Sequence, residues 1–273
     1  MVILYLGDYY LSEEHFLQDN NVPCVRLDYP FSHNGNIGVQ SGDTVLIRGG
    51  KLNTSAYADV AHYFEQHGIN CVVSAHDYEK IASAVEYSKC FGKYAPKVLM
   101  FDINEPIDSI SHALSASELT FPLFVRSDVE SAAKYVGFES CVLKSNTHDD
   151  IAAVIRPIKD HVANPTKVVM KEIVNTMKIN GKNIEYRAIV VAGKIICFDY
   201  EANTEIPSPD SLDCYGQFEE CVSLAFQNGL SGAYFVDFGI NSNGDIFVVE
   251  CKNVINGTIK SVDSFMKGLK NLQ

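Results

Sequence analysis

The chain has 273 residues and a formal net charge of −12, and 47% of its residues are hydrophobic. This length and composition suit one large or two medium domains with an ordinary apolar core. Nucleic acid is not expected as a partner, because the acidic balance would repel a phosphate backbone.

The sequence shows neither a targeting pattern nor a metal-binding cysteine pattern. No apolar run approaches the length of about eighteen residues that a membrane span needs, and residues 2–10 lack the basic lead-in of a secretory signal. The eight cysteines are scattered without a CxxC motif, which disfavours zinc sites and disulfide frameworks. We therefore expect a cytoplasmic protein with reduced thiols and no membrane partner.

The first 115 residues alternate between strand and helix patterns. Apolar runs predict strands at 2–6, 22–27, 43–47 and 69–74. Helical patterns occupy 11–20, 55–67 and 77–94. Strands that alternate with helices are typical of a parallel, doubly wound sheet, so we expect an α/β domain over 1–115.

From residue 116 onward, the pattern changes to strands that are joined largely by turns. These strands are predicted at 121–127, 140–145, 167–174, 184–191, 194–200 and 232–251. Ala192-Gly193 forms a two-residue turn of the kind that suits strand twist. Helices are predicted at 128–136, 149–161 and 215–229. This pattern predicts antiparallel sheets and an α+β fold.

The segment YFVDFGINSNGDIFVVECKN contains two apolar strand patterns on either side of a polar turn. A hairpin over this segment would bring Asp237 and Glu250 close together. Two facing carboxylates in apolar strands indicate binding of a hard cation such as Mg²⁺. The alternative is a hairpin whose acidic residues lie at a solvated rim.

The order of these segments resembles the ATP-grasp superfamily. An α/β front region precedes FPLFVRSD (121–128), VVMKEIV (168–174), EYRAIVVAGKII (185–196) and the hairpin of an Asp strand and a Glu strand. The Arg of FVRSD and the lysines after it are similar to a divergent clade of small phage and bacterial ATP-grasp proteins.

This resemblance implies a particular domain organisation. A pre-ATP-grasp α/β domain would occupy 1–115, and an ATP-grasp domain with antiparallel sheets would occupy 116–273. The latter would consist of subdomains at about 116–173 and 174–273, with ATP bound between them.

The resemblance also implies ligands for the nucleotide. Arg126 stands where the family more often has a Lys that reaches the phosphates, and it suits phosphate oxygens bidentately. Either Lys134 or Lys144 would be a further phosphate lysine. The structural alternatives are an Arg126–Asp128 ion pair and two solvated lysines.

Three further residues are assigned by the same resemblance. Lys171 would lie beside the adenine, and Glu172 would accept hydrogen bonds from the ribose hydroxyls. Arg187, in an apolar strand, would bind the γ-phosphate or an acyl phosphate, because a buried Arg without an anion is costly. A structural ion pair is the alternative for Arg187.

Asp237 and Glu250 are the Mg²⁺ carboxylates that the resemblance implies, with Asn253 as the amide ligand. The family pattern is Glu-x-Asn, whereas this chain reads Glu250-Cys251-Lys252-Asn253. In a regular strand Glu250 and Asn253 would point to opposite faces, unless a bulge or turn intervenes. Lys252 occupies the expected position and would contact phosphate directly.

The activity that the resemblance implies is ATP-dependent ligation through an acyl phosphate, with Arg126 and Arg187 as the catalytic cations. A carboxylate substrate and an amine acceptor are the expected partners besides ATP. The acceptor is either a small molecule or a protein terminus, and the sequence leaves both substrates and the oligomeric state open. Two alternatives use the same cleft: phosphoryl transfer to a hydroxyl, and a nucleotide-binding interaction module without turnover.

Two turns in the front region, Gly7-Asp8 and Arg48-Gly49-Gly50, follow predicted parallel strands. Ligands gather at the carboxyl ends of such strands. These turns are therefore either part of the acceptor site or simple tight turns.

Overall fold

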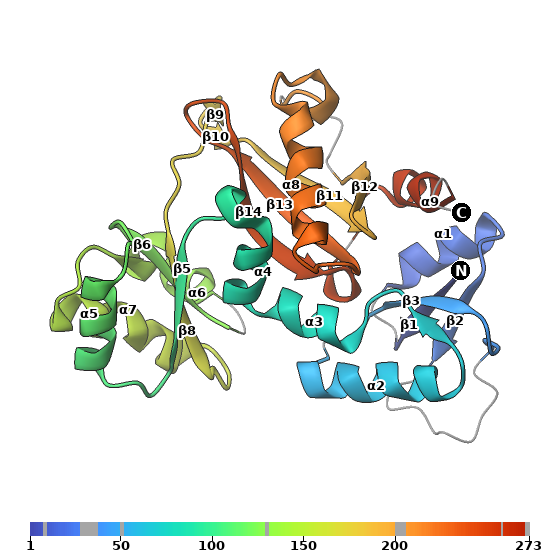
Figure 1. Cartoon of the computed structure of the whole chain (residues 1–273), viewed down its shortest axis with the longest axis horizontal. Coiled ribbons are helices and arrows are strands. Elements are labelled where there is room, and N and C mark those ends of the chain that lie inside the picture. Colours follow the sequence, from blue (N-terminus) through green and yellow to red (C-terminus); the bar gives the residue numbers. More distant parts are fainter. Residues whose placement is uncertain are drawn as a thin grey trace.

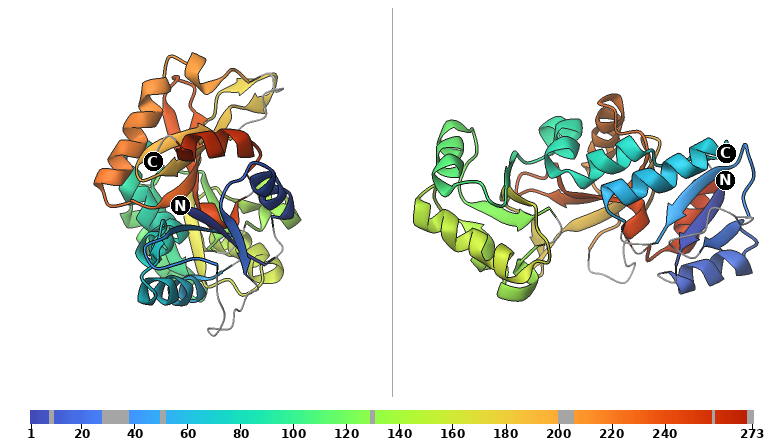
Figure 2. Two further views of the ribbon diagram at one scale, coloured as in Figure 1. Left: turned by 90° about the vertical axis from the view of Figure 1, so that its right-hand side faces the viewer. Right: turned by 90° about the horizontal axis from the view of Figure 1, so that it is seen from below.

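The computed structural model describes residues 1–7, 10–27, 38–49, 52–128, 131–199, 206–257 and 259–270. Three four-stranded sheets follow one another across the molecule (Figure 1), and β9 and β10 form a further two-stranded sheet. We call the four-stranded sheets the front sheet (β2-β1-β3-β4), the central sheet (β12-β11-β13-β14) and the side sheet (β5-β8-β6-β7). The central sheet lies between the other two, as the view from below also shows (Figure 2).

The front sheet is parallel, as predicted. Its strands are β1 (Val2–Leu6), β2 (Cys24–Leu27), β3 (Thr44–Arg48) and β4 (Asn70–Cys71). The helices that accompany it are α1 (Leu11–Asp19) and α2 (Thr54–Gln66), and the side chain of Asn53 caps the latter by accepting from the Ala56 N–H. The predicted strand at 69–74 is reduced to β4.

The single helix that the sequence predicts at 77–94 is in fact two helices, α3 (Ala75–Ala82) and α4 (Ala84–Phe91), followed by the 3₁₀ turn η1 (Gly92–Tyr94). Ser83 ends the first helix and caps the second, because its extended backbone breaks the helix and its side chain accepts from the Glu86 N–H. Helix α4 thereby turns away from the front sheet and packs on α8 and β14 of the central sheet.

The side sheet is antiparallel, with the strands β5 (Val98–Asp102), β6 (Leu123–Ser127), β7 (Val142–Leu143) and β8 (Lys167–Glu172). One face packs against α5 (Ile107–Ala116) and α7 (His148–His161), and α6 (Ala133–Val136) and η2 (Phe138–Cys141) complete this unit. Within the described part of the predicted helix at 128–136, α6 is the helical segment, and Pro157 lies inside α7 without ending it.

Strand β5 was not among the predicted strands, and it pairs with β8 along its whole length. Residues before 115 therefore belong to the side sheet. The change from the front sheet to the side sheet thus comes before residue 115. We propose that the domain boundary lies just before β5.

The central sheet is antiparallel and contains β11 (Glu185–Val191), β12 (Lys194–Phe198), β13 (Ala233–Ile240) and β14 (Ile246–Asn253). The turn between β11 and β12 has positive φ at both Ala192 and Gly193, which is the geometry expected for a two-residue hairpin turn. The remaining elements are β9 (Lys178–Ile179), β10 (Lys182–Asn183), α8 (Tyr215–Gln227), η3 (Pro209–Ser211), η4 (Val254–Asn256) and α9 (Val262–Lys270).

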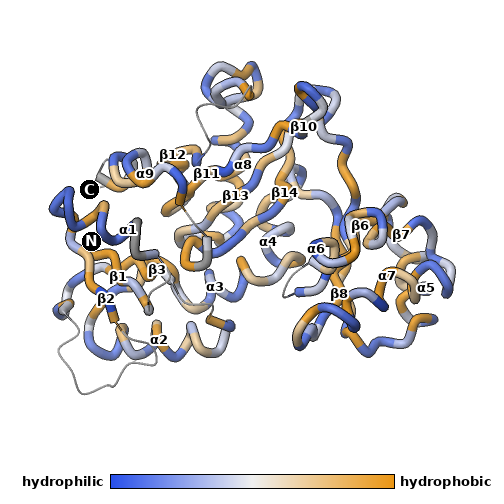
Figure 3. Tube along the Cα trace, turned by 180° about the vertical axis from the view of Figure 1, so that it is seen from behind, coloured by the Kyte–Doolittle hydropathy of each residue, from blue (hydrophilic) through white to orange (hydrophobic). Residues whose placement is uncertain are grey.

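Both faces of the central sheet are covered by apolar cores. One face, with Ile189 and Phe235, shares a core with the front sheet and α2. The other, with Tyr186 and Phe238, packs on α4 and α8. Hydrophobic stretches accordingly follow the strands in Figure 3. No helix among the described residues has the length and apolarity to cross a bilayer.

Candidate functional site

Asp237 on β13 and Glu250 on β14 are direct partners in the register of the central sheet, which confirms that the hairpin brings these carboxylates together. The pairing shifts by one residue directly after them, because Phe238 faces Val248 rather than Val249. Val249 is therefore the extra residue of a β-bulge.

The bulge decides which side chains of β14 face the site. Val248 is buried in the core with α8, and three residues later Cys251 is buried in the same core. A strand without a bulge would place these two residues on opposite faces. The extra residue lets Glu250 and Lys252 share the other face with Asp237, and it leaves Asn253 on the side of Cys251.

Arg187 lies directly opposite Asp237 on β11. Its Nε and Nη2 donate to Oδ1 and Oδ2 of Asp237 over 2.7 and 2.9 Å, a bidentate pair that raises the pKa of the guanidinium. Lys252 approaches the same carboxylate, with Nζ 3.3 Å from Oδ2 of Asp237 and 2.5 Å from Oε2 of Glu250.

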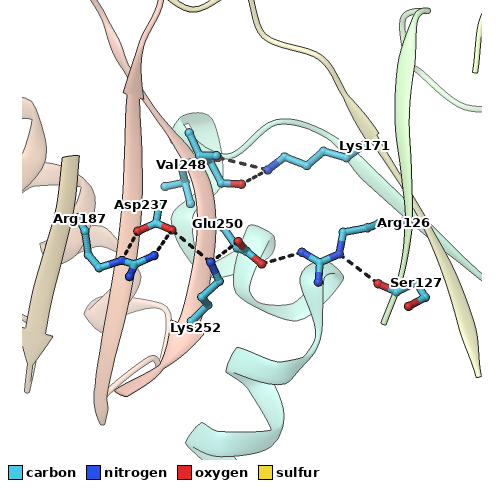
Figure 4. A network of polar contacts seen from close by, with 9 residues as sticks. Arg126, Ser127, Lys171, Arg187, Asp237, Val248, Glu250 and Lys252 are labelled. Carbon is cyan, nitrogen blue, oxygen red and sulfur yellow. Dashed lines mark hydrogen bonds and ion pairs between the residues drawn. The ribbon is translucent and has the colours of Figure 1, made fainter. Parts of the chain in front are cut away.

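A second sheet contributes Arg126, from β6. Its Nη1 donates to Oε1 of Glu250 over 2.6 Å, and its Nε donates to the carbonyl of Ser127 over 3.1 Å. Burial alone would raise the pKa of Glu250, but the charges of Arg126 and Lys252 outweigh it and the pKa is lowered. Glu250 is therefore held as a carboxylate between two cations (Figure 4).

Lys171 on β8 also crosses from the side sheet to the central sheet. Its ammonium group donates to the carbonyl oxygens of Val249 and, over 3.5 Å, Val248, which the bulge exposes. Burial lowers its pKa to about 8, despite the opposing influence of Glu250. Lys171 and Arg126 thus lie on one face of the side sheet and both reach β14 (Figure 4).

Next to these two cations the same face of the side sheet is apolar, and further along it Asp102 and Lys167 form an ion pair. By register, Val98, Met100, Phe124 and Val169 share this face with Arg126 and Lys171. The ring of Phe124 stacks on that of Phe138 with centroids 5.1 Å apart, and Met100 and Phe138 are exposed. An apolar surface next to cations suits a nucleotide, whose base is flat and whose phosphates are anionic.

The other predicted nucleotide ligands lie outside this group. Both carboxylate oxygens of Glu172 accept backbone N–H groups, from Thr120 over 3.0 Å and from Lys97 over 3.3 Å. Lys134 is an exposed residue of α6, and Lys144 is exposed beyond the end of β7. Among the described residues, Asp237 and Glu250 form ion pairs with Arg126, Arg187 and Lys252, and not with Lys134 or Lys144.

The structure does not bring Asn253 together with the two carboxylates proposed for the metal. Its amide is buried on the opposite face of β14, where Nδ2 donates to the carbonyl of Tyr78 over 3.2 Å. The physical reason is that the bulge lies before Glu250. The strand is regular from Glu250 to Asn253, so these two side chains point to opposite faces. Lys252 takes the position two residues after Glu250 on the same face.

Arg48 in the front sheet is fully buried and structural. Its guanidinium donates to both carboxylate oxygens of Glu13, over 2.9 and 2.7 Å, and to the carbonyl of Gly257 over 2.8 Å. The front sheet is thereby tied to the segment that follows β14. Of the other residues suggested for an acceptor site, Gly7 and Gly49 have positive φ, and Asp8 and Gly50 lie outside the described residues.

The donor set fits a divalent cation that brings ligands of its own. Within the described ranges, no group of three or more acidic, histidine or cysteine side chains could hold a metal ion. Asp237 and Glu250 supply carboxylate oxygens from adjacent strands, and Mg²⁺ is commonly held by one or two carboxylates together with substrate phosphates. These two residues would hold Mg²⁺ as part of an Mg-nucleotide.

Two features of this site escaped the sequence analysis. The contact of Lys171 with the bulge carbonyls was missed, and so was the direct pairing of Arg126 with Glu250. Val248 and Cys251 are three residues apart and both buried in one core, which indicates the bulge. The sequence alone does not show that both residues face the same core.

The family model described as ATP-grasp domain, R-2-K clade family 2, matches residues 106–263, which is more than half of the chain. The comparison with curated proteins found no match.

Solved structures share the fold at low sequence identity. A RimK domain ATP-grasp protein from Sphaerobacter thermophilus superposes with a TM-score of 0.63 and 15% identity, over 98% of this chain and 96% of that one. The VanG D-Ala:D-Ser ligase from Enterococcus faecalis has a TM-score of 0.60 and 15% identity, over 98% and 94%. N5-carboxyaminoimidazole synthetase from Staphylococcus aureus, complexed with ADP, has a TM-score of 0.61 and 14% identity, over 98% and 76%.

Proposed function

The chain belongs to the ATP-grasp family, in the clade and family that its matching model describes, and from this premise we propose that it is an ATP-dependent carboxylate–amine ligase. Mg-ATP binds between the side sheet and the central sheet. The observation that carries this proposal is the meeting of Arg126, Arg187 and Lys252 at two facing carboxylates, next to the apolar face of the side sheet.

The nucleotide base fits the apolar face around Met100 and Phe124, where Lys171 stands beside it. Glu172, at the end of the same strand, accepts from the ribose hydroxyls once its backbone contacts yield. Either Lys134 or Lys144 adds a further phosphate contact. These assignments place the triphosphate along the row of cations, from Arg126 towards Arg187.

The reaction proceeds in two steps. The substrate carboxylate oxygen attacks the γ-phosphorus, which forms an acyl phosphate and releases ADP. The amine then attacks the acyl carbon, loses a proton and displaces inorganic phosphate. Mg²⁺ supplies charge neutralisation at the phosphate oxygens when it is bound.

The protein contributes positioning and electrostatics to these steps. Arg126 and Arg187 neutralise charge that develops on the transferring phosphoryl group, since both are fixed in place before the reaction. All eight cysteines are free, and none is needed as a nucleophile. Free thiols also suit the reducing cytoplasm, which we propose as the location of the enzyme.

The test combines nucleotide binding with product analysis. We expect ATP and ADP with Mg²⁺ to raise the unfolding midpoint, since binding to the folded form alone must stabilise it. ADP and phosphate should then be released only when a suitable carboxylate and amine are both present. A stable phosphorylated product without phosphate release would indicate a kinase, and binding without turnover on any mixture would indicate an inactive module.

Variants connect the activity to the site. Asp237→Asn with Glu250→Gln should abolish ADP release and leave the fold intact. The matched control is Asp263→Asn with Glu220→Gln, which removes two carboxylates from exposed ion pairs with Lys267 and Lys93. Equal loss of activity in both double variants would contradict the assignment.

A further inference from the structure

The two site carboxylates already have a complete set of cationic partners. Oδ1 and Oδ2 of Asp237 accept from Arg187, Oε1 of Glu250 accepts from Arg126, and Lys252 reaches Oδ2 of Asp237 and Oε2 of Glu250. Every carboxylate oxygen of the pair therefore has a charged donor within 3.3 Å. A divalent cation that bridged the two residues would have to take the place of Lys252.

We propose that the ammonium group of Lys252 is a built-in substitute for a divalent cation between Asp237 and Glu250, so that free Mg²⁺ is excluded and the metal enters only together with ATP. The second half of this proposal rests on the proposed function. The first half concerns the folded chain alone.

Charge is the first argument for exclusion. Two carboxylates with three cationic side chains form a cluster with an excess of positive charge. A free divalent cation is repelled by such a cluster, because like charges a few ångströms apart interact strongly in a partly buried site. A triphosphate reverses the balance, since it brings several negative charges that the three cations and the metal can share.

Mobility of Lys252 is the second argument. The Arg187 side chain is 27% exposed and Arg126 is 28% exposed, whereas the side chain of Lys252 is 40% exposed. Arg126 also donates to the carbonyl of Ser127, and the guanidinium of Arg187 lies over the ring of Phe235. Lys also has a long flexible stem that carries a point charge. Lys252 is therefore the member of the cluster that can swing from the carboxylates to a phosphate oxygen when the Mg-nucleotide arrives.

The backbone fixes this arrangement. The bulge at Val249 orients Glu250 and Lys252 towards Asp237. Lys252 carries a cation at this position and not an oxygen ligand. Asn253, which could have offered an amide oxygen, is turned away. The chain thus places an ammonium group where an oxygen ligand would otherwise extend the metal site.

The experiment measures Mn²⁺ binding by the full-length protein without nucleotide, from the loss of the EPR signal of free Mn²⁺. We expect the wild type to bind Mn²⁺ only in the millimolar range at this site. Lys252→Met removes the competing charge, and Lys252→Asn also supplies an oxygen. Both should bind one Mn²⁺ at least tenfold more tightly, and adding Asp237→Asn to Lys252→Met should remove the gain.

Two controls make the result specific to the charge at this position. Lys252→Arg retains a cation and should exclude Mn²⁺ as the wild type does. Lys89→Met removes an exposed lysine that pairs with Glu86, and it should leave Mn²⁺ affinity unchanged. Circular dichroism and the unfolding midpoint confirm that each variant is folded.

The proposal is overturned if the nucleotide-free wild type binds Mn²⁺ as tightly as Lys252→Met, or if Lys252→Arg gains affinity as Lys252→Met does. The coupled half is tested by repeating the titration with ADP, which should create a tight Mn²⁺ site in the wild type. If ADP does not bind at all, the proposed function fails, but the nucleotide-free difference between wild type and Lys252→Met still decides the exclusion by Lys252.

Discussion

Lys171 provides a quantitative test of the contact between the side sheet and the central sheet. Its ammonium group is buried against the carbonyl oxygens of the β14 bulge, and burial lowers its pKa from 10.5 to about 8. The unfolded chain regains the ordinary pKa. Between these two values, the unfolded state binds more protons than the folded state, so stability must rise with pH through this range.

The size of the effect follows from the same linkage. At about pH 9 roughly nine-tenths of the folded molecules have lost this proton while the unfolded chain retains it, so folding gains about 1 kcal/mol relative to about pH 7. Lys171→Met abolishes this gain because no proton remains to be released. Lys171→Arg also abolishes it, since a guanidinium stays charged throughout the range.

Urea unfolding of the wild type and both variants at several pH values between neutral and about 10 measures the effect. Other groups also titrate there, but they are common to all three proteins and cancel in the differences. The expected result is that the wild type gains on both variants as pH rises. Parallel stability curves from neutral pH to about 10 would show that Lys171 is not buried against the bulge and would refute the reasoning.

Three further outcomes are expected. A double-mutant cycle of Arg126→Met and Glu250→Gln, measured by urea unfolding, should give a coupling free energy of about 1 kcal/mol, because the ion pair is partly buried but still screened by solvent. Additive effects of the two substitutions on stability would contradict the pairing. The lowered pKa of Glu250 stabilises the fold above the ordinary carboxylate range and loses this effect as pH falls through it, so the stability advantage of the wild type over Glu250→Gln should shrink in acid. Gly268→Ala should destabilise by about 1–3 kcal/mol, since its Cβ would lie 2.4 Å from the carbonyl oxygen of Ile196, whereas Gly216→Ala in α8 meets nothing within 4 Å and should be neutral or slightly stabilising. Thermal or urea unfolding measures the stability of both variants. Equal stability of Gly268→Ala and Gly216→Ala would contradict the packing of α9.

Local patterns were sufficient to predict most of the fold. Alternating strands and helices predicted the parallel front sheet, and the Ala192-Gly193 turn predicted the hairpin of the central sheet. The prediction failed where long-range pairing decides. Strand β5 contains the short apolar run Val98-Leu99-Met100-Phe101, a local strand signal that was passed over, but its place in the side sheet is set by long-range pairing with β8.

The site was predictable in part for the same reason. The facing of Asp237 and Glu250 follows from one hairpin, which sequence reasoning handles well. The arrival of Arg126 and Lys171 depends on how two separate sheets dock, and no spacing within the chain records that. The row of cations is therefore a property of tertiary structure, although each of its members could be identified in the sequence as a candidate.

The bulge on β14 links these levels. A single extra residue, Val249, decides which side chains of Glu250-Cys251-Lys252-Asn253 face the site, because successive side chains of a strand point to opposite faces. It also frees two carbonyl oxygens for Lys171, which ties the side sheet to the strand that carries Glu250. Removing Val249 would therefore do more than shorten a strand: Glu250 and Lys252 would turn into the core beneath α8, Cys251 would turn towards Asp237, and the anchor for Lys171 would be lost. Deletion of Val249 should accordingly abolish nucleotide binding and lower stability together, whereas a change of charge at Lys252 alone should alter metal binding in a folded protein.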